Sequence, residues 1–232
     1  MKPAEKDLHK YRLKSFIKNE SMAFTPLAEK TGQQPKRKRV HDLRVSIRKM
    51  RSIVDEDFLK KLGKTLGDVR DLDVAIRNAK AYHLDNSDLK KERKYLRKKI
   101  KKSLRPSKLH KLNIKLKSIV NKVNQKPDVP ARAQEMIKKL HTWEHPMKRE
   151  ELHPFRKTIK EVRYLLEATG QKTDYLINLQ DHLGKVHDLE VFARFYKKNP
   201  TIEKEREVQI KESKKLSQQA IKRAIADLRA LT

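Results

Sequence analysis

The 232-residue sequence has no cysteine, which excludes disulfide bonds, thiolate metal sites and cysteine nucleophiles. Glycine and proline are scarce, at 5 and 9 residues, so there is little material for β-hairpins or glycine-rich phosphate loops. No run of about 18 apolar residues is present to cross a bilayer, and the first residues lack the apolar segment of a secretory signal. We therefore expect a soluble, cytoplasmic protein.

Acidic residues are also in short supply. The 30 Asp and Glu residues stand against 59 Lys and Arg, which gives a formal net charge of +29. Such a charge repels itself in a compact fold unless an anion lies near it, so the first functional inference is a polyanionic partner. The abundant Lys, Leu, Arg, Glu and Ile favour helices, and the apolar residues recur at helical spacing. We predict an all-α fold.

The spacing predicts about nine helices. They are expected at 5–21, 40–52, 56–84, 87–104, 107–124, 131–145, 152–169, 173–197 and 201–230. A proline- and glycine-containing loop is expected between the first two, over residues 24–39. The stretch QKPDVP at 125–130 has two prolines in six residues and is the best internal boundary.

The segment VHDLRVSIRKMRS at 40–52 forms a cationic ridge beside an apolar stripe. At about 100° per residue, the ridge residues fall within an arc of roughly 80°. The N-terminal ridge consists of His41, Arg44, Arg48 and Arg51. A solvated helix face would explain one such ridge.

A second segment of the sequence carries the same ridge. Residues 152–166 align without gaps on residues 40–54, and the C-terminal ridge consists of His153, Arg156, Lys160 and Arg163. Residues 62–74 likewise align on 179–191. Packing does not require histidine and basic residues at matching offsets. The repeat of roughly 110 residues is too long for a solenoid unit and suggests two similar helical bundles related by an approximate twofold axis, with the ridges facing one another.

Other residues are auxiliary candidates. Asp71 and Asp188 occupy equivalent places in the second repeated segment, and we expect them to orient ridge side chains or to form surface ion pairs. Gly67 and Gly184 are expected to allow close approach of helices. Further possible ligands are Lys49 and Lys157 at the edges of the ridges, and a set at helical spacing: Lys90, Lys94, Arg97 and Lys101. A solvated face is an equally simple interpretation of that last set.

The pairing of HDLRVSIRKMR with LGDVRDLDV, and of HPFRKTIKEVRYLLE with LGKVHDLEV, resembles the CHAD family, the conserved histidine α-helical domain. The resemblance implies one domain over 1–232, made of four-helix bundles at 1–124 and 131–232 joined by a linker at 125–130. It also implies binding of inorganic polyphosphate in a basic central groove or pore, with both ridges as phosphate ligands. Lys160 replaces Arg48 and His187 replaces Arg70 in the second copy, which makes equal binding by the two halves doubtful.

Several functions remain open from the sequence. We predict binding without catalysis, with no cofactor and no metal, because each ridge histidine stands among arginines that repel a cation. Non-specific DNA or RNA binding is the main alternative, although aromatic residues for base stacking are few, at 6%. A phosphoryl-transfer or metal-dependent role for His41 and His153, oriented by Asp71 and Asp188, is a weaker one, and membrane-surface binding is the weakest. Polyphosphate should bind more tightly at pH 6 than at pH 8, and association with polyphosphate granules is expected.

Overall fold

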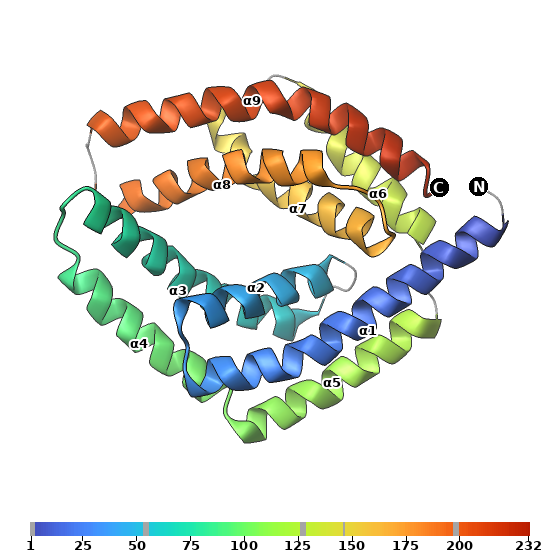
Figure 1. Ribbon diagram of the computed structural model, residues 1–232, viewed down its shortest axis with the longest axis horizontal. Coiled ribbons are helices and arrows are strands. Elements are labelled where there is room, and N and C mark those ends of the chain that lie inside the picture. The colour runs from blue at the N-terminus through green and yellow to red at the C-terminus, as the bar shows by residue number, and fades with distance from the viewer. Residues whose placement is uncertain (1–2, 53–55, 126–128, 146, 197–199) are drawn as a thin grey trace. The chain divides into compact units, whose positions relative to one another are not determined.

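The computed structural model describes residues 3–52, 56–125, 129–145, 147–196 and 200–232, and these form helices without strands (Figure 1). The all-α prediction is confirmed. The helices are α1 (Pro3–Gln33), α2 (Arg37–Arg51), α3 (Asp57–Ala81), α4 (Ser87–Ser103), α5 (Pro106–Gln125), α6 (Val129–His141), α7 (Leu152–Ala168), α8 (Asp174–Phe195) and α9 (Pro200–Arg229), with a short 3-10 helix at Arg149–Glu151 before α7. None of these helices is long and apolar enough to span a membrane.

The chain divides into two compact units. The N-terminal unit is Ser15–Lys126, and the C-terminal unit combines Met1–Lys14 with Pro127–Thr232. Residues 1–14 thus group with the second half of the chain. The sequence predicts them in the first bundle, at 1–124. The expected linker at 125–130 is described only in part, because residues 126–128 lie outside the described ranges; Gln125 ends α5, and residues 129 and 130 begin α6.

The start of α1 is fixed to the end of α7. Arg12 donates a hydrogen bond of 3.1 Å from Nη1 to the Thr169 carbonyl, and the same carbonyl lies 3.3 Å from Nδ1 of His9. A cation at the carboxyl end of a helix is favoured, because the unpaired carbonyls there carry partial negative charge. These contacts explain why the first turns of α1 belong to the C-terminal unit.

The loop predicted over residues 24–39 is wrong. Helix α1 continues through Pro26 to Gln33, and only residues 34–36 separate it from α2. An interior proline costs about 3 kcal/mol, but the fully buried Phe24 and Ala28 on either side of it pack into the core. Gly32 is a close-approach glycine rather than a turn glycine, because a Cβ there would lie 2.7 Å from the Leu104 carbonyl oxygen.

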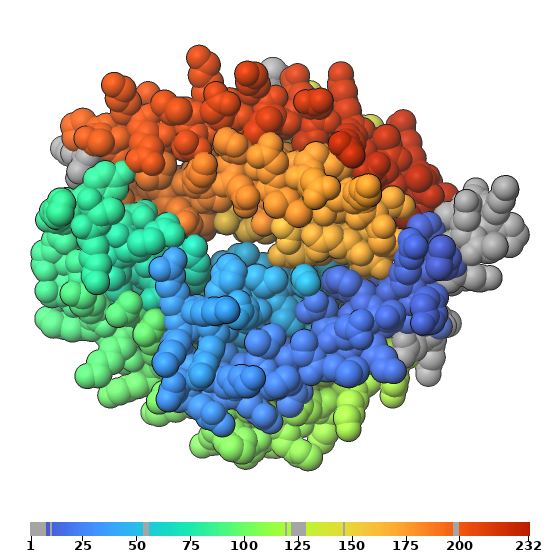
Figure 2. All heavy atoms as spheres, in the orientation of Figure 1, coloured from blue at the N-terminus to red at the C-terminus, as the bar shows by residue number. Residues whose placement is uncertain are grey.

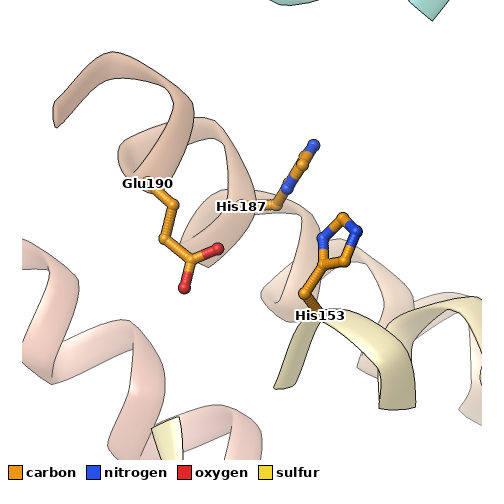
Figure 3. A group of neighbouring side chains, drawn as sticks. All are labelled: His153, His187 and Glu190. Carbon is orange, nitrogen blue, oxygen red and sulfur yellow. The ribbon is translucent and has the colours of Figure 1, made fainter. Parts of the chain in front are cut away.

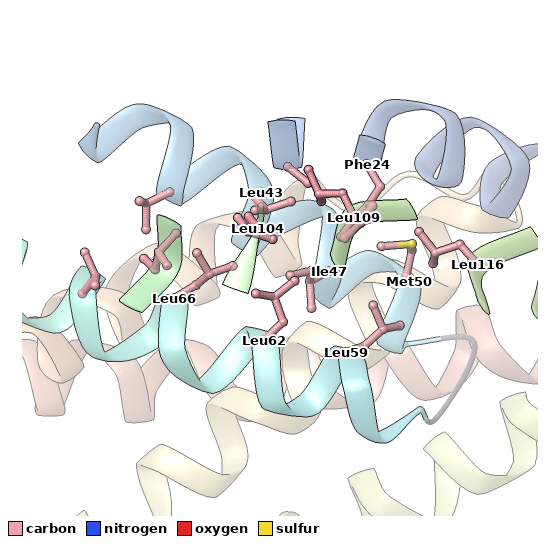
Figure 4. Close-up of a cluster of buried hydrophobic side chains, with 14 of the residues drawn as sticks. Phe24, Leu43, Ile47, Met50, Leu59, Leu62, Leu66, Leu104, Leu109 and Leu116 are labelled. Atoms are coloured by element: carbon pink, nitrogen blue, oxygen red, sulfur yellow. The ribbon is translucent and has the colours of Figure 1, made fainter. Parts of the chain in front are cut away.

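The core of the N-terminal unit is formed by side chains from helices α1 to α5 (Figure 4). Leu43, Ile47 and Met50 from the stripe on α2 meet Leu62 and Leu66 of α3. Every one of these side chains is less than a tenth exposed. Because this stripe faces the core, the adjacent ridge of α2 is left at the edge of the packed surface.

The C-terminal unit is built around α8. Helix α8 packs along α9 and against α7, and α6 contacts both α7 and α9. In the space-filling view, the atoms of α9 and α8 meet over most of their length (Figure 2). The buried residues of the C-terminal unit include Phe155 and Ile159 of α7 and Leu183 of α8. The second apolar stripe thus anchors α7 as the first anchors α2.

Candidate anion-binding site

The N-terminal ridge keeps its side chains within reach of solvent. His41 and Arg51 are exposed, and Arg44 and Arg48 are half-buried. All four belong to α2, whose buried face is turned into the core. The sequence prediction that these residues share one accessible face of a helix agrees with this arrangement.

In each unit, one ridge arginine lies across a glycine of the neighbouring helix. A Cβ on Gly67 of α3 would lie 3.7 Å from Nε and Nη2 of Arg44. A Cβ on Gly184 of α8 would lie 4.0 Å from Nη2 of Arg156 on α7. The space left by each glycine is therefore bordered by a guanidinium, which corrects the expectation that these glycines serve close helix approach. The same contact occurs twice, at equivalent positions of the repeat.

The C-terminal ridge is more deeply set than the N-terminal one. Lys160 is buried, with 7% of its surface exposed, whereas its counterpart Arg48 is half-buried. Arg163 forms an ion pair with Glu167 at 3.2 Å, and its guanidinium lies 4.6 Å from the ring centre of Tyr164. Arg163 is thus held by its own helix, while its counterpart on α2 is exposed.

Both ridge histidines have a lowered pKa. For His41, which is exposed overall, partial loss of hydration around the ring is still the main cause, followed by the charge of Arg70. Burial also dominates at His153, where Lys157 and other nearby cations help to lower the pKa to about 4. His153 is therefore neutral at physiological pH. The ridge histidines become charged near neutral pH only if a bound anion raises these pKa values. We therefore expect the gain in polyphosphate affinity at a lower pH than the sequence alone predicts, below about pH 6.

A second cationic surface lies in the N-terminal unit, on α4. All four predicted auxiliary residues, Lys90, Lys94, Arg97 and Lys101, line a hollow of about 610 Å³. It is also lined by Gln34, Pro35, Lys36, Arg93 and Lys98. Seven of these nine residues are cationic and none is acidic, so the hollow suits an anion of several charges. We call it the α4 hollow.

Asp73, which was not among the residues predicted from the sequence, binds two arginines of the α4 hollow. Its carboxylate is 2% exposed and receives hydrogen bonds from Arg93 at 3.0 Å and from Arg97 at 3.1 Å. The signal was available, because Asp73 follows Leu66 and Val69 by seven and four residues and so falls on the apolar face of α3. A carboxylate at such a position needs a cationic partner.

The remaining predicted residues differ in their surroundings. Lys49 donates to Glu20 of α1 at 2.8 Å and lies 5.6 Å from the ring centre of Phe16, so it joins α2 to α1. Lys157 is exposed and close enough to His153 to lower its pKa. Asp71 and Asp188 are both half-buried, and their orienting role stays a prediction.

Comparison with protein families matches the CHAD domain over residues 55–197, more than half of the chain. The protein therefore belongs to the CHAD family. The matched region contains the C-terminal ridge and both copies of the second repeated segment, residues 62–74 and 179–191, which we call the LG segments. It begins just after α2. Comparison with curated proteins gives no match.

Proposed function

We propose that this protein binds inorganic polyphosphate without catalysing its turnover, through the N-terminal and C-terminal ridges. The observation that carries the proposal is the repeated placement of Arg44 across Gly67 and of Arg156 across Gly184. Each unit thus places a guanidinium at the same position of the repeat, beside the space that the glycine leaves. The planar fork of the guanidinium suits two phosphate oxygens at once.

Polyphosphate matches the charge and chemistry of these surfaces. It is a flexible thread with about one negative charge per phosphate unit and no bases to recognise, so a receptor needs closely spaced cations rather than aromatic platforms. Each charge-assisted hydrogen bond contributes about 1.5 to 3 kcal/mol net. Several arginines in each unit therefore suffice for tight binding that weakens as salt rises.

The α4 hollow extends the proposed site within the N-terminal unit. Six of its seven cations lie on α4, between residues 90 and 101, and Asp73 binds two of them, Arg93 and Arg97. Two arginines on one carboxylate leave a net positive charge. This surface would take a further stretch of the same polyanion, and a role at polyphosphate granules in the cytoplasm belongs to the same proposal.

The test is titration calorimetry with long-chain polyphosphate at about 150 mM and about 500 mM salt. An Arg44→Ala, Arg156→Ala double variant is expected to lose at least about 2 kcal/mol of binding free energy. The control is Arg105→Ala, Arg229→Ala, which removes the same number of positive charges from each unit at exposed positions outside the ridges. Equal losses in the two variants would mean that affinity comes from diffuse charge and would overturn the ridge assignment.

Two further measurements separate this proposal from its rivals. Polyphosphate is expected to displace bound DNA at low molar excess, whereas dedicated nucleic-acid binding would resist it. Incubation with polyphosphate is expected to release no phosphate. Sustained phosphate release would replace the binding role with a phosphohydrolase one.

A further inference from the structure

Two histidines and a glutamate come together in the C-terminal unit (Figure 3). His187 and Glu190 lie three residues apart on α8 and so share one face of that helix, while His153 projects from the first turn of α7. One potential ligand atom from each residue lies within 4.8 Å of the others. The two imidazole rings have their centres 5.1 Å apart.

This donor set fits a transition metal ion. Two imidazole nitrogens and one carboxylate oxygen are ligands that Zn²⁺ takes in three-ligand sites, where one position stays open. An ion about 2.1 Å from each donor would hold the donors within about 4.2 Å of one another. The present spacing, within 4.8 Å, exceeds that limit by at most about 0.6 Å. His153 already carries the neutral imidazole that a metal requires, because burial and nearby cations lower its pKa.

We propose that the C-terminal unit binds one divalent transition metal ion of the zinc class through His153, His187 and Glu190. From the sequence no metal is expected, because arginines surround each ridge histidine, and the metal-dependent alternative relied on Asp71 and Asp188. The structure brings a different histidine and a different carboxylate to His153. No other such group of three occurs among the described residues.

The surrounding charge limits the strength of this site. Arg149, Arg156 and Arg194 are close enough to Glu190 to affect its pKa, and Lys157 acts on His153. Their repulsion of a dication lowers the affinity, so we expect binding in the micromolar range rather than the tighter binding of a structural zinc. The same cations would attract an anion to the open position of the metal.

The repeat supplies a natural control within the same chain. The residues equivalent to His153, His187 and Glu190 in the N-terminal unit are His41, Arg70 and Asp73. Arg70 places a cation where the second imidazole stands, and Asp73 is already bound by two arginines. The N-terminal unit therefore lacks the donor set, and replacing His187 by arginine copies its composition.

The experiment is calorimetric titration of Zn²⁺ into the full chain without phosphate, repeated with Co²⁺ to detect ligand-field absorption. The wild type is expected to bind one ion at this site, and His187→Arg and His153→Gln are expected to weaken binding at least tenfold. His41→Gln is the matched control and should leave binding unchanged. Circular dichroism shows whether each variant is folded.

Absence of binding to the wild type would overturn the proposal. So would binding that survives both substitutions, because the ion would then be held elsewhere, for example at the exposed pair His141 and Glu144. The titration contains no polyphosphate, so its result is independent of the polyphosphate proposal.

Discussion

The two units contain the same pair of helices in different polar surroundings. One helix carries a ridge (α2 or α7), and the next carries an LG segment (α3 or α8). In the N-terminal unit, Asp73 is buried and bound by two arginines of α4. In the C-terminal unit, the equivalent Glu190 is half-buried, and burial raises its pKa. The apolar stripe and the arginine across the glycine are shared. The two copies thus share their packing and the placement of one arginine. They differ at the carboxylate, which is bound by two arginines at Asp73 and has a raised pKa at Glu190.

The largest expected effect concerns these two carboxylates. Asp73→Asn removes the charge that two arginines surround and should lower the free energy of unfolding by about 3 kcal/mol, the low end for a broken buried pair, because both arginines are about a quarter exposed. Glu190→Gln should change it by less than about 0.5 kcal/mol, because burial already disfavours the charged form. Urea unfolding measures both.

Equal losses for Asp73→Asn and Glu190→Gln would contradict the contrast between the units. Arg93→Ala serves as the control for the N-terminal unit, since Arg97 still pairs with the carboxylate. It should cost less than Asp73→Asn does.

A second prediction tests the feature that the two units share. Gly67→Ala and Gly184→Ala should fold and bind polyphosphate normally, because a Cβ would meet the arginine at 3.7 Å and 4.0 Å, which is ordinary contact. Gly67→Leu and Gly184→Leu should push the guanidinium aside and weaken binding about tenfold, or about 1.4 kcal/mol. Calorimetry compares each leucine variant with its alanine control. Unchanged affinity in the leucine variants would show that the arginine placement does not matter.

Much of this comparison was predictable from the sequence. The all-α fold and the two ridges follow from helical spacing, because the apolar residues that must be buried fix which face of each helix stays accessible. The CHAD resemblance agrees with the family match over 55–197. The α4 set was recognised by its spacing, although spacing does not show that its residues line a hollow.

Other features depended on tertiary contacts. The proline and glycine of residues 24–39 predict a loop, but burial of Phe24 and Ala28 and the approach of Gly32 to Leu104 stabilise a continuous helix. The meeting of His153 with Glu190 joins two helices, and neither sequence segment contains that information. The lowered pKa of His153 also arises from burial, which the exposed-ridge interpretation did not include.

The third prediction uses the histidines of the two units. The pKa of His153 is about 4 in the folded protein and 6.5 ordinarily, so the unfolded chain takes up a proton first as pH falls. Stability should therefore be full above about pH 7, decrease as the pH falls through 6.5 and level off below about pH 4. His41 has the same direction of shift. Thermal melts at about pH 7.5 and about pH 5 should show a fall of a few degrees.

The two histidines should contribute unequally to that fall. His153→Gln should remove more of the pH dependence than His41→Gln does, because the pKa of His153 is lowered further, to about 4. A steeper loss in His153→Gln than in the wild type would contradict the lowered pKa. For binding, the sign is opposite: an anion that raises these pKa values should bind more tightly at about pH 5 than at about pH 7.

The smallest expected effect concerns Arg163, which its own helix holds while its counterpart Arg51 is exposed. Glu167→Gln removes the charge that pairs with Arg163 and keeps an oxygen to accept the hydrogen bond of Thr173. Releasing the guanidinium should raise polyphosphate affinity about twofold to threefold, the scale of one partly exposed ion pair. The matched control is Glu161→Gln, which makes the same charge change on α7 but removes an ion pair of Lys139, which stays paired with Glu135. Equal gains in both variants would mean that net charge, and not the ridge position of Arg163, sets the affinity.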